Sequence, residues 1–148
     1  MYCGNYIKMG SILSIDYGLK RIGLAISDSS RSFAFPLSVL ENKGFIYVLE
    51  SIKNLIIERE IDLILIGIPY NSKQETKKTS MQSIVEEFID KIQEKITIPI
   101  VKVDERFSSF MAEENLKDAG INTKKSKKFI DLEAARLLLE EYLKENVS

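Results

Sequence analysis

The chain of 148 residues contains no histidine at all. Without histidine there is no Ser-His-Asp triad, no Cys-His catalytic pair and no histidine-bound zinc site. If the protein is an enzyme, its acid–base and metal chemistry must therefore come from carboxylates, lysine or tyrosine.

Cysteine is almost as scarce, because Cys3 is the only one. An internal disulfide is excluded, and a reducing cytoplasm is the compartment we expect. No apolar stretch reaches the roughly 18 residues that a membrane helix needs. The first eight residues have neither a continuous hydrophobic run nor a basic start, so we expect no signal peptide and no membrane partner.

A large net charge is absent too, since 21 basic residues face 22 acidic ones and the formal charge is −1. This balance argues against a protein wrapped wholly in nucleic acid, but it is compatible with a local basic face. Internal repeats and Gly-, Ser- or Pro-rich linkers are also missing. We expect residues 1–10 to be a short N-terminal extension and residues 11–148 to be a single domain.

Short apolar runs alternate with longer amphipathic segments along the chain. The pattern predicts strands at 12–15, 22–26, 32–39, 63–68 and 98–103. It predicts helices at 45–60, 79–95, from 108 or 109 to 119, and 129–144. The first two strands form a hairpin, and strands separated by helices pair in parallel. The expected fold is α/β, a mixed sheet with helices on both faces, and Pro36 suits an edge strand.

Asp16 ends the first apolar run in the stretch SILSIDYGLKRIGLAISD. The adjacent acids Asp104 and Glu105 end another predicted strand. In open α/β sheets, ligands bind beyond the carboxyl ends of the strands. A carboxylate on such a rigid strand is well placed for a metal ion or a phosphoryl group. The alternative is that Asp16 only starts the turn that follows it.

A further acid, Asp131, lies in the last predicted helix. It shares a helix face with Ala134, Ala135, Leu138 and Tyr142, at spacings of three, four, seven and eleven residues. The two alanines let that end of the helix approach the sheet, which directs the carboxylate inward. The alternative is that Asp131 is a first-turn acid favoured by the helix dipole.

Acids brought together at one edge of a sheet repel one another unless cations are bound. Oxygen ligands, without histidine or a useful cysteine, select Mg²⁺ or Mn²⁺ over zinc. Two such ions support phosphodiester hydrolysis, because one activates water and the other stabilises the leaving oxygen.

Four motifs, IDYGLKRIGLAISD, LILIGIPYN, VDERFSS and KKSKKFIDLEAARLLLEEYL, resemble in order and spacing those of the YqgF/RuvX-type family of pre-16S rRNA nucleases. These proteins are also described as Holliday-junction-resolvase-like and belong to the RNase H-like superfamily. The resemblance covers residues 11–143, nearly the whole chain. It implies an RNase H-like fold with a five-stranded sheet in the order 3-2-1-4-5.

By position, the resemblance implies that Asp16, Glu105 and Asp131 are catalytic residues and metal ligands. Asp104 is a further catalytic candidate, although Glu105 is the preferred ligand of the two. Arg106 either steadies the scissile phosphate or pairs with a neighbouring carboxylate, because the arginine fork suits both roles.

Basic residues flank the predicted site, and residues 123–128 carry four lysines and no acid. Such lysines can neutralise phosphates without reading the base sequence. The alternative is an ordinary solvated surface. The expected substrate contacts are Lys20, Arg21, Asn71, Arg106, Lys124, Lys125, Lys127 and Lys128.

The chain departs from the family pattern at two places. Related resolvases have an acid at the end of the fourth strand, but the stretch 67–71 (GIPYN) has none. The loop 72–78 also lacks the Asp-Gly pair expected in this family. The first departure removes one expected ligand from the metal site.

The resemblance implies a Mg²⁺- or Mn²⁺-dependent endonuclease that processes the 5′ end of pre-16S rRNA, with small-subunit precursors as further partners. Cleavage of branched DNA such as a Holliday junction is the nearest alternative, and the residues do not separate the two substrates. A non-catalytic RNA-binding assembly factor is a second alternative, motivated by the missing fourth-strand acid. Asp16-Tyr17-Gly18 also resembles the first phosphate loop of actin-like and sugar-kinase-like proteins, but those use two such domains and we predict one here.

Overall fold

The computed structural model describes residues 10–70, 80–105, 118, 120 and 127–146. Its elements, in chain order, are β1 (Ser11–Asp16), β2 (Arg21–Ser27), β3 (Ala34–Glu41), α1 (Phe45–Glu58), β4 (Ile61–Ile68), α2 (Met81–Gln93), β5 (Ile100–Asp104) and α4 (Lys127–Asn146). This order matches the prediction, with ends displaced by one or two residues. The helix predicted to end at residue 119 lies outside the described residues, apart from the helical Asp118.

The five strands form one sheet in the order β3-β2-β1-β4-β5. β1 pairs antiparallel with β2, and β2 pairs antiparallel with β3. β4 lies parallel to both β1 and β5. The mixed sheet and the order 3-2-1-4-5 are therefore confirmed, and Pro36 lies on the edge strand β3.

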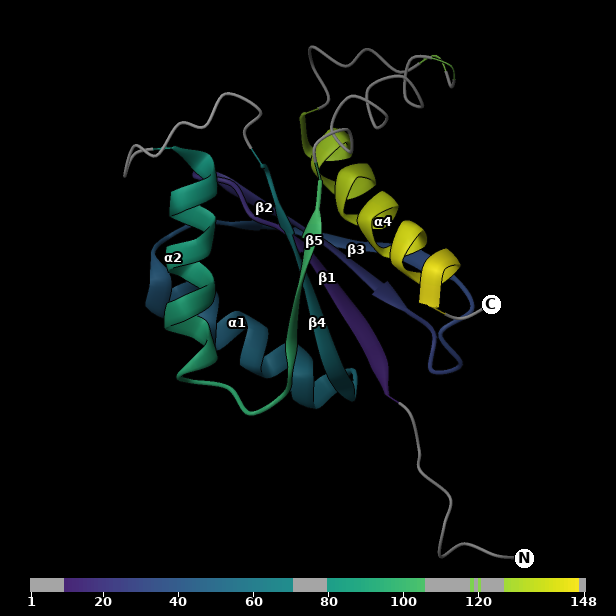
Figure 1. Ribbon diagram of the computed structural model, residues 1–148, viewed down its shortest axis with the longest axis horizontal. Helices are drawn as coiled ribbons and strands as arrows, with labels where there is room; N and C mark the ends of the chain where they lie inside the picture. Colours follow the sequence, from purple (N-terminus) through teal and green to yellow (C-terminus); the bar gives the residue numbers. More distant parts are fainter. Residues whose placement is uncertain (1–9, 71–79, 106–117, 119, 121–126, 147–148) are drawn as a thin grey trace, which may run out of the picture.

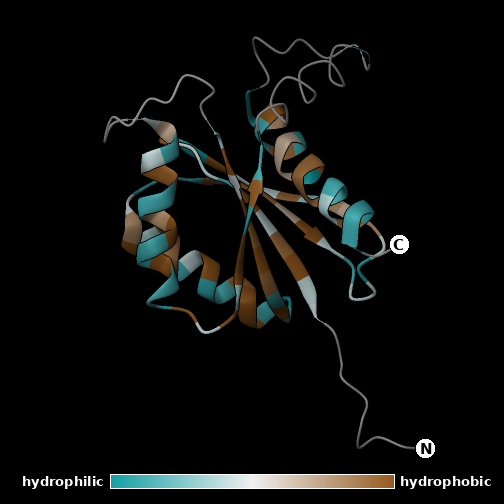
Figure 2. Ribbon diagram, in the orientation of Figure 1, coloured by the Kyte–Doolittle hydropathy of each residue, from teal (hydrophilic) through white to brown (hydrophobic). Residues whose placement is uncertain are grey.

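Helices cover both faces of the sheet, as predicted: α1 and α2 lie on one face and α4 on the other (Figure 1). The first face buries large aliphatic side chains, among them Ile15, Ile52 and Ile66. The face under α4 buries a smaller cluster that includes Ala25 and Ala135. Figure 2 shows the apolar residues concentrated in the strands at the centre. Among the described residues, no helix is long and apolar enough to cross a membrane.

Local chemistry explains where two of the helices begin. The Ser80 hydroxyl accepts a hydrogen bond from the Ser83 backbone N–H at 3.1 Å, so Ser80 caps α2 and the helix begins at Met81. α4 begins earlier than predicted, at Lys127. Lysine is a good helix former, and no glycine or proline separates Lys127 and Lys128 from Phe129. These two lysines therefore lie in the first turn of α4 and not in a preceding link.

Candidate active site

Asp16 lies at the carboxyl end of β1 and faces α4. Side chains alternate between the two faces along a strand, and the earlier residues of the same parity contact the α4 side. Ile12 belongs to the core cluster under α4, and the Ser14 hydroxyl donates to the Ala135 carbonyl at 2.8 Å. Asp16 is thus held at the end of a rigid, buried strand and directed toward the helix that carries Asp131.

Glu105 follows β5, and its side chain lies beside that of Asp16, which is at the end of β1; β4 lies between these two strands. Its backbone N–H donates to the Ile68 carbonyl at 3.1 Å, which continues the β4–β5 ladder one residue past β5. Its side chain follows Val101 and Val103, which pack under α4. A Cβ at Gly67 would lie 2.5 Å from Oε2 of Glu105. The Glu105 carboxyl therefore occupies the space above Gly67, at the end of the fourth strand where the expected acid is missing.

Asp131 approaches the site from α4 through a close helix–sheet contact. Gly23 in β2 makes this contact possible, because a Cβ there would overlap the backbone carbonyl of Asp131. The predicted close approach at the two alanines is confirmed, since Ala134 and Ala135 are fully buried. No acid lies in the first turn of α4, so the interpretation of Asp131 as a first-turn acid is wrong. That interpretation failed because the helix begins at Lys127.

Burial dominates the electrostatics of the carboxyl pair. Loss of hydration raises the pKa of Asp16 to about 6; a hydrogen bond with Glu105 opposes this rise, and the charge of Asp131 adds to it. Loss of hydration also raises the pKa of Glu105, and the nearby charge and hydrogen bond of Asp16 reinforce the rise. Both side chains belong to half-buried residues, and two adjacent carboxyls whose pKa values are raised in this way favour a state in which the pair retains a proton at neutral pH.

One observation bears directly on cation binding. Oε2 of Glu105 is buried and has no hydrogen-bond partner among the described residues. A buried carboxylate oxygen without a partner is costly, and a hard divalent cation is the ligand that such oxygens prefer. Within the described part of the chain, no group of three or more His, Cys, Asp or Glu side chains is arranged so that it could hold a metal ion. Asp131, the third acid, is instead paired with Arg21 at 2.8 Å.

Among the other predicted site residues, some are exposed and some lie outside the described residues; Asp104, next to Glu105, contributes its charge, which adds to the rise in the pKa of Glu105. Asp104 is exposed, and by strand alternation it faces away from α4. Lys20, Lys127 and Lys128 are exposed as well. The predicted contacts outside the described residues are Asn71, Arg106, Lys124 and Lys125.

Three residues that the sequence analysis did not single out shape the site. Gly23 and Gly67 provide the space for Asp131 and Glu105, and Ser14 anchors α4 to β1. Glycine inside a strand often marks a close backbone approach, and a serine within an apolar strand needs a buried partner. Those were the available signals, and neither of them comes from an acidic or basic residue.

A basic groove with a volume of about 530 Å³ is connected to the site through Arg21, which lines the groove and pairs with Asp131. It is bordered by the β1–β2 turn, the β2–β3 edge and the first turn of α4. Its lining residues are Leu19, Lys20, Arg21, Val39, Glu41, Asn42, Lys43 and Lys128. Four of the eight are cationic and one is acidic. Arg21 is paired with Asp131 and Lys43 with Glu41. Lys20 and Lys128 are therefore the cations that suit the groove to a phosphate backbone.

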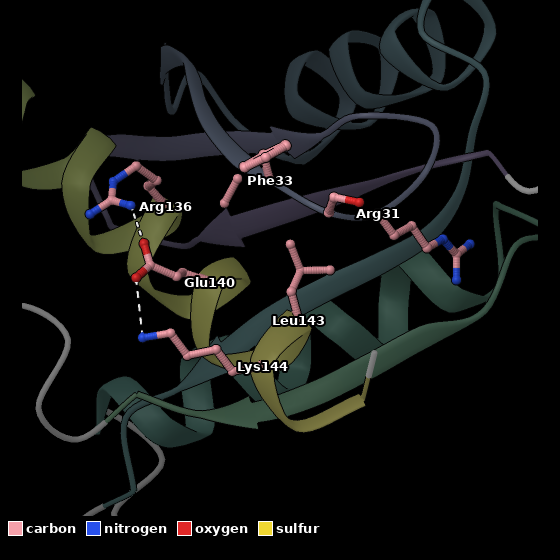
Figure 3. A pocket seen from close by; sticks show the side chains of 8 residues that line it. Arg31, Phe33, Arg136, Glu140, Leu143 and Lys144 are labelled. Atoms are coloured by element: carbon pink, nitrogen blue, oxygen red, sulfur yellow. Dashed lines mark hydrogen bonds and ion pairs between the residues drawn. The ribbon is translucent and has the colours of Figure 1, made fainter. Parts of the chain in front are cut away.

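A second open pocket lies near the other end of α4 (Figure 3). Its charges are already paired: Glu140 lies between Arg136 and Lys144, and Arg31 binds Asp62. Since Arg31 also donates to the carbonyl of Gly10, just before β1, this pocket lies at the opposite end of that strand from Asp16. Its polar groups hold the fold together and leave the carboxylate edge as the candidate site.

Comparison with known sequences gives matches along nearly the whole chain. Residues 10–145 match the family model RuvX, described as Holliday junction resolvase. A protein of Maridesulfovibrio salexigens named "Putative pre-16S rRNA nuclease" is 39% identical, over 89% of this chain and 96% of its own. A protein of Mycoplasmopsis synoviae with the same name is 38% identical, over 88% and 95%.

Solved structures with a similar fold include two resolvases bound to Holliday junctions. Thermus thermophilus RuvC aligns with a TM-score of 0.58 and 10% identity, over 93% of this chain and 96% of its own. The fowlpox virus resolvase aligns with a TM-score of 0.56 and 14% identity, over 93% and 99%. At such low identity the likeness concerns the fold, and it agrees with the RNase H-like architecture expected from the sequence.

Proposed function

The chain belongs to the RuvX family, described as Holliday junction resolvases, and from this premise we propose that it is a divalent-cation-dependent nuclease. Its substrate is precursor 16S rRNA, and its reaction is hydrolysis of a phosphodiester bond near the 5′ end. The site is the carboxylate edge of the sheet, built from Asp16, Glu105 and Asp131. Mg²⁺ or Mn²⁺ is the expected cation.

The observation that carries this proposal is the buried, unpartnered Oε2 of Glu105 beside Asp16. Folding has placed two carboxyls together where neither is well hydrated, which a purely structural site would avoid. Their raised pKa values mark a group of residues under electrostatic strain, as is common in functional sites. A cation bound there would replace the retained proton and satisfy the free oxygen.

Asp16 and Glu105 would hold the cation, and Asp131 would supply a third oxygen. When bound, the cation polarises the phosphate and activates water for attack on phosphorus. The chain's own residues do the rest. The rigid end of β1 fixes Asp16, the contact over Gly67 fixes Glu105, and Lys20 and Lys128 in the basic groove neutralise neighbouring phosphates.

RNA is preferred over branched DNA because relatives 38–39% identical to the chain carry the rRNA nuclease name. The description of the family keeps junction cleavage as the second candidate. An enzyme that processes ribosomal RNA would work in the cytoplasm, together with small-subunit precursors.

The missing fourth-strand acid is a weaker objection to catalysis than the sequence alone suggested. Glu105 reaches the space above Gly67 from β5. The carboxylate is thus supplied by the next strand, and a non-catalytic assembly factor would have no need to keep its Oε2 buried without a hydrogen-bond partner among the residues that the structure describes.

A cleavage assay tests the proposal. Wild type, Asp16→Asn and Asp90→Asn would be incubated with a labelled precursor 16S 5′ leader and with a four-way DNA junction, with Mg²⁺, with Mn²⁺ or with EDTA. Asp90 is an exposed acid on α2, so Asp90→Asn makes the same chemical change away from the site. We expect cation-dependent cleavage of the RNA that only Asp16→Asn abolishes.

Each other result has a definite meaning. Cleavage of the junction alone would make DNA the substrate. Absence of cation-dependent cleavage, or equal cleavage by all three proteins, would overturn the nuclease proposal and favour the RNA-binding factor.

A further inference from the structure

The third acid of the site is paired with an arginine. Nε of Arg21 donates to Oδ2 of Asp131 at 2.8 Å. Arg21 is the first residue of β2, and by alternation it shares the α4 face with Gly23 and Ala25. The side chains of Arg21 and Asp131 are 30% and 22% exposed. The pair is therefore accessible from one side and buried enough to be held in place.

This pairing occupies an acid that the cation needs. The backbone of Asp131 is fixed by the contact between its carbonyl and Gly23. Only the Asp131 side chain can therefore change its interaction partner. Asp131 is also close enough to raise the pKa of Asp16. A positive charge at Asp131 thus stabilises the site before any cation is bound, and Arg21 supplies it.

The Arg21 guanidinium can also bind a ligand in the basic groove. Arg21 also lines the basic groove, together with Lys20, Lys43 and Lys128. An arginine fork binds a phosphate as readily as a carboxylate. When a divalent cation neutralises the carboxylates, a phosphate in the groove becomes the better partner for Arg21.

We propose that Arg21 is a positioning residue that acts as an internal counter-ion for Asp131, yields that acid to the divalent cation, and then contacts a backbone phosphate of the substrate in the groove. This proposal rests on the proposed function, since it assumes that the carboxylates bind a cation. It predicts that Arg21 and the cation compete for Asp131. A purely structural arginine would instead help cation binding by holding the acid in position.

Calorimetric titration with Mn²⁺ tests the competition without measuring cleavage. Arg21→Gln should bind Mn²⁺ roughly fivefold more tightly than wild type, because the competing partner of Asp131 is lost. Lys20→Gln is the matched control. Lys20 is the residue before Arg21 and also lines the groove, so this substitution removes one positive charge from the same region. We expect its Mn²⁺ affinity to stay within about twofold of wild type. Arg21→Lys should fall between wild type and Arg21→Gln.

Binding of a labelled single-stranded RNA tests the second half of the proposal. In this binding assay Ca²⁺ would be used in place of Mn²⁺, because Ca²⁺ also binds oxygen ligands. Wild type should bind the RNA more tightly with Ca²⁺ than with EDTA, because Arg21 is released to the phosphates. This gain should be lost in Arg21→Gln and kept in Lys20→Gln, since Lys20 contacts the groove in both states.

The outcomes separate this inference from the proposed function. If wild type binds Mn²⁺ and Arg21→Gln binds it equally or more weakly, the inference is overturned and the nuclease proposal stands. If no variant binds Mn²⁺, both the inference and the cation-dependent mechanism are overturned. Circular dichroism would check folding, and Arg21→Lys, still predicted to bind Mn²⁺ more tightly than wild type, carries the test if Arg21→Gln does not fold.

Discussion

The two faces of the sheet differ in the residues that make the closest contacts with the covering helices. Under α1 and α2 the core is large and aliphatic, as Leu13, Ile52 and Ile64 show. The core under α4 also contains large residues such as Leu65 and Leu139, but its closest contacts are made by small ones, with Gly23 and Ser14 facing the backbone of the helix. Large side chains fill the interface with α1 and α2, whereas small residues let the backbones of α4 and the sheet come close together.

This difference separates stability from chemistry. Large buried side chains contribute most of the hydrophobic free energy of folding. Small residues contribute less, but they allow a helix and a sheet to place Asp16, Glu105 and Asp131 at one edge. Substitutions on the first face should therefore change stability alone, and substitutions on the second should change both or mainly activity.

The largest effect is expected from Gly23→Ala. The added methyl group would overlap the carbonyl of Asp131, and backbone atoms cannot move aside cheaply. We expect the free energy of unfolding to fall by at least about 3 kcal/mol in urea denaturation. Ala25→Gly, two residues along the same face, should cost only about 1 kcal/mol. Equal effects of the two substitutions would refute the close contact with α4.

Ile52→Ala tests the aliphatic face. Ile52 is fully buried in α1, so its truncation leaves a cavity and should cost about 3 kcal/mol. Cleavage activity per folded molecule, measured well below the melting temperature, should stay within about twofold of wild type. A loss of activity larger than the loss of folded protein would show that the two faces are coupled.

In contrast to the result expected for Ile52→Ala, Gly67→Ala should lower activity more than stability. Its Cβ would meet Oε2 of Glu105 at 2.5 Å and Cδ1 of Leu138 at 2.8 Å, and both are ends of flexible side chains. Stability should fall by only about 1 kcal/mol, while displacement of the Glu105 carboxyl should lower activity about tenfold or more. Unchanged activity in kinetic assays would mean that the position of Glu105 over Gly67 does not matter.

The smallest effect is a dependence of stability on pH. The folded state raises the pKa of Asp16 from 3.8 to about 6, so the folded protein holds this proton more tightly than the unfolded chain does. Without cations, stability should therefore fall as pH rises from about 4 through 6. Compared with Asp16→Asn, wild type should lose roughly 5 °C in melting temperature over this range.

Thermal melts in EDTA, with Asp90→Asn as control, would measure this loss. Mn²⁺ should restore more stability at pH 7.5 than at pH 5, because ligands must lose their protons to bind it. Parallel curves for wild type and Asp16→Asn would contradict the burial of Asp16.

Much of the fold could be predicted because its signals are local. Apolar periodicity located the described strands and helices, and Pro36 marked the edge strand. The sheet order came from the family resemblance. The position of Asp131 was predicted only in part, because the inward face was right but the helix begins two residues earlier, at Lys127.

The rest could not be predicted because it depends on pairs of residues far apart in the chain. The partnership of Arg21 and Asp131 spans 110 positions, and nothing near either residue indicates the other. The space above Gly67 is likewise invisible until β4 and β5 are paired. Strand alternation would have favoured Glu105 over Asp104, but only once the register of β5 was known.

The bond from Ser14 to Ala135 joins residues 121 positions apart, and this has a consequence for synthesis. On the ribosome the first acid emerges early and the last only with α4. A nascent chain that has not yet exposed Asp131 can therefore contain all five strands of the sheet but still lacks one acid of the site. The site is therefore complete only after α4 has left the ribosome and packed on the sheet.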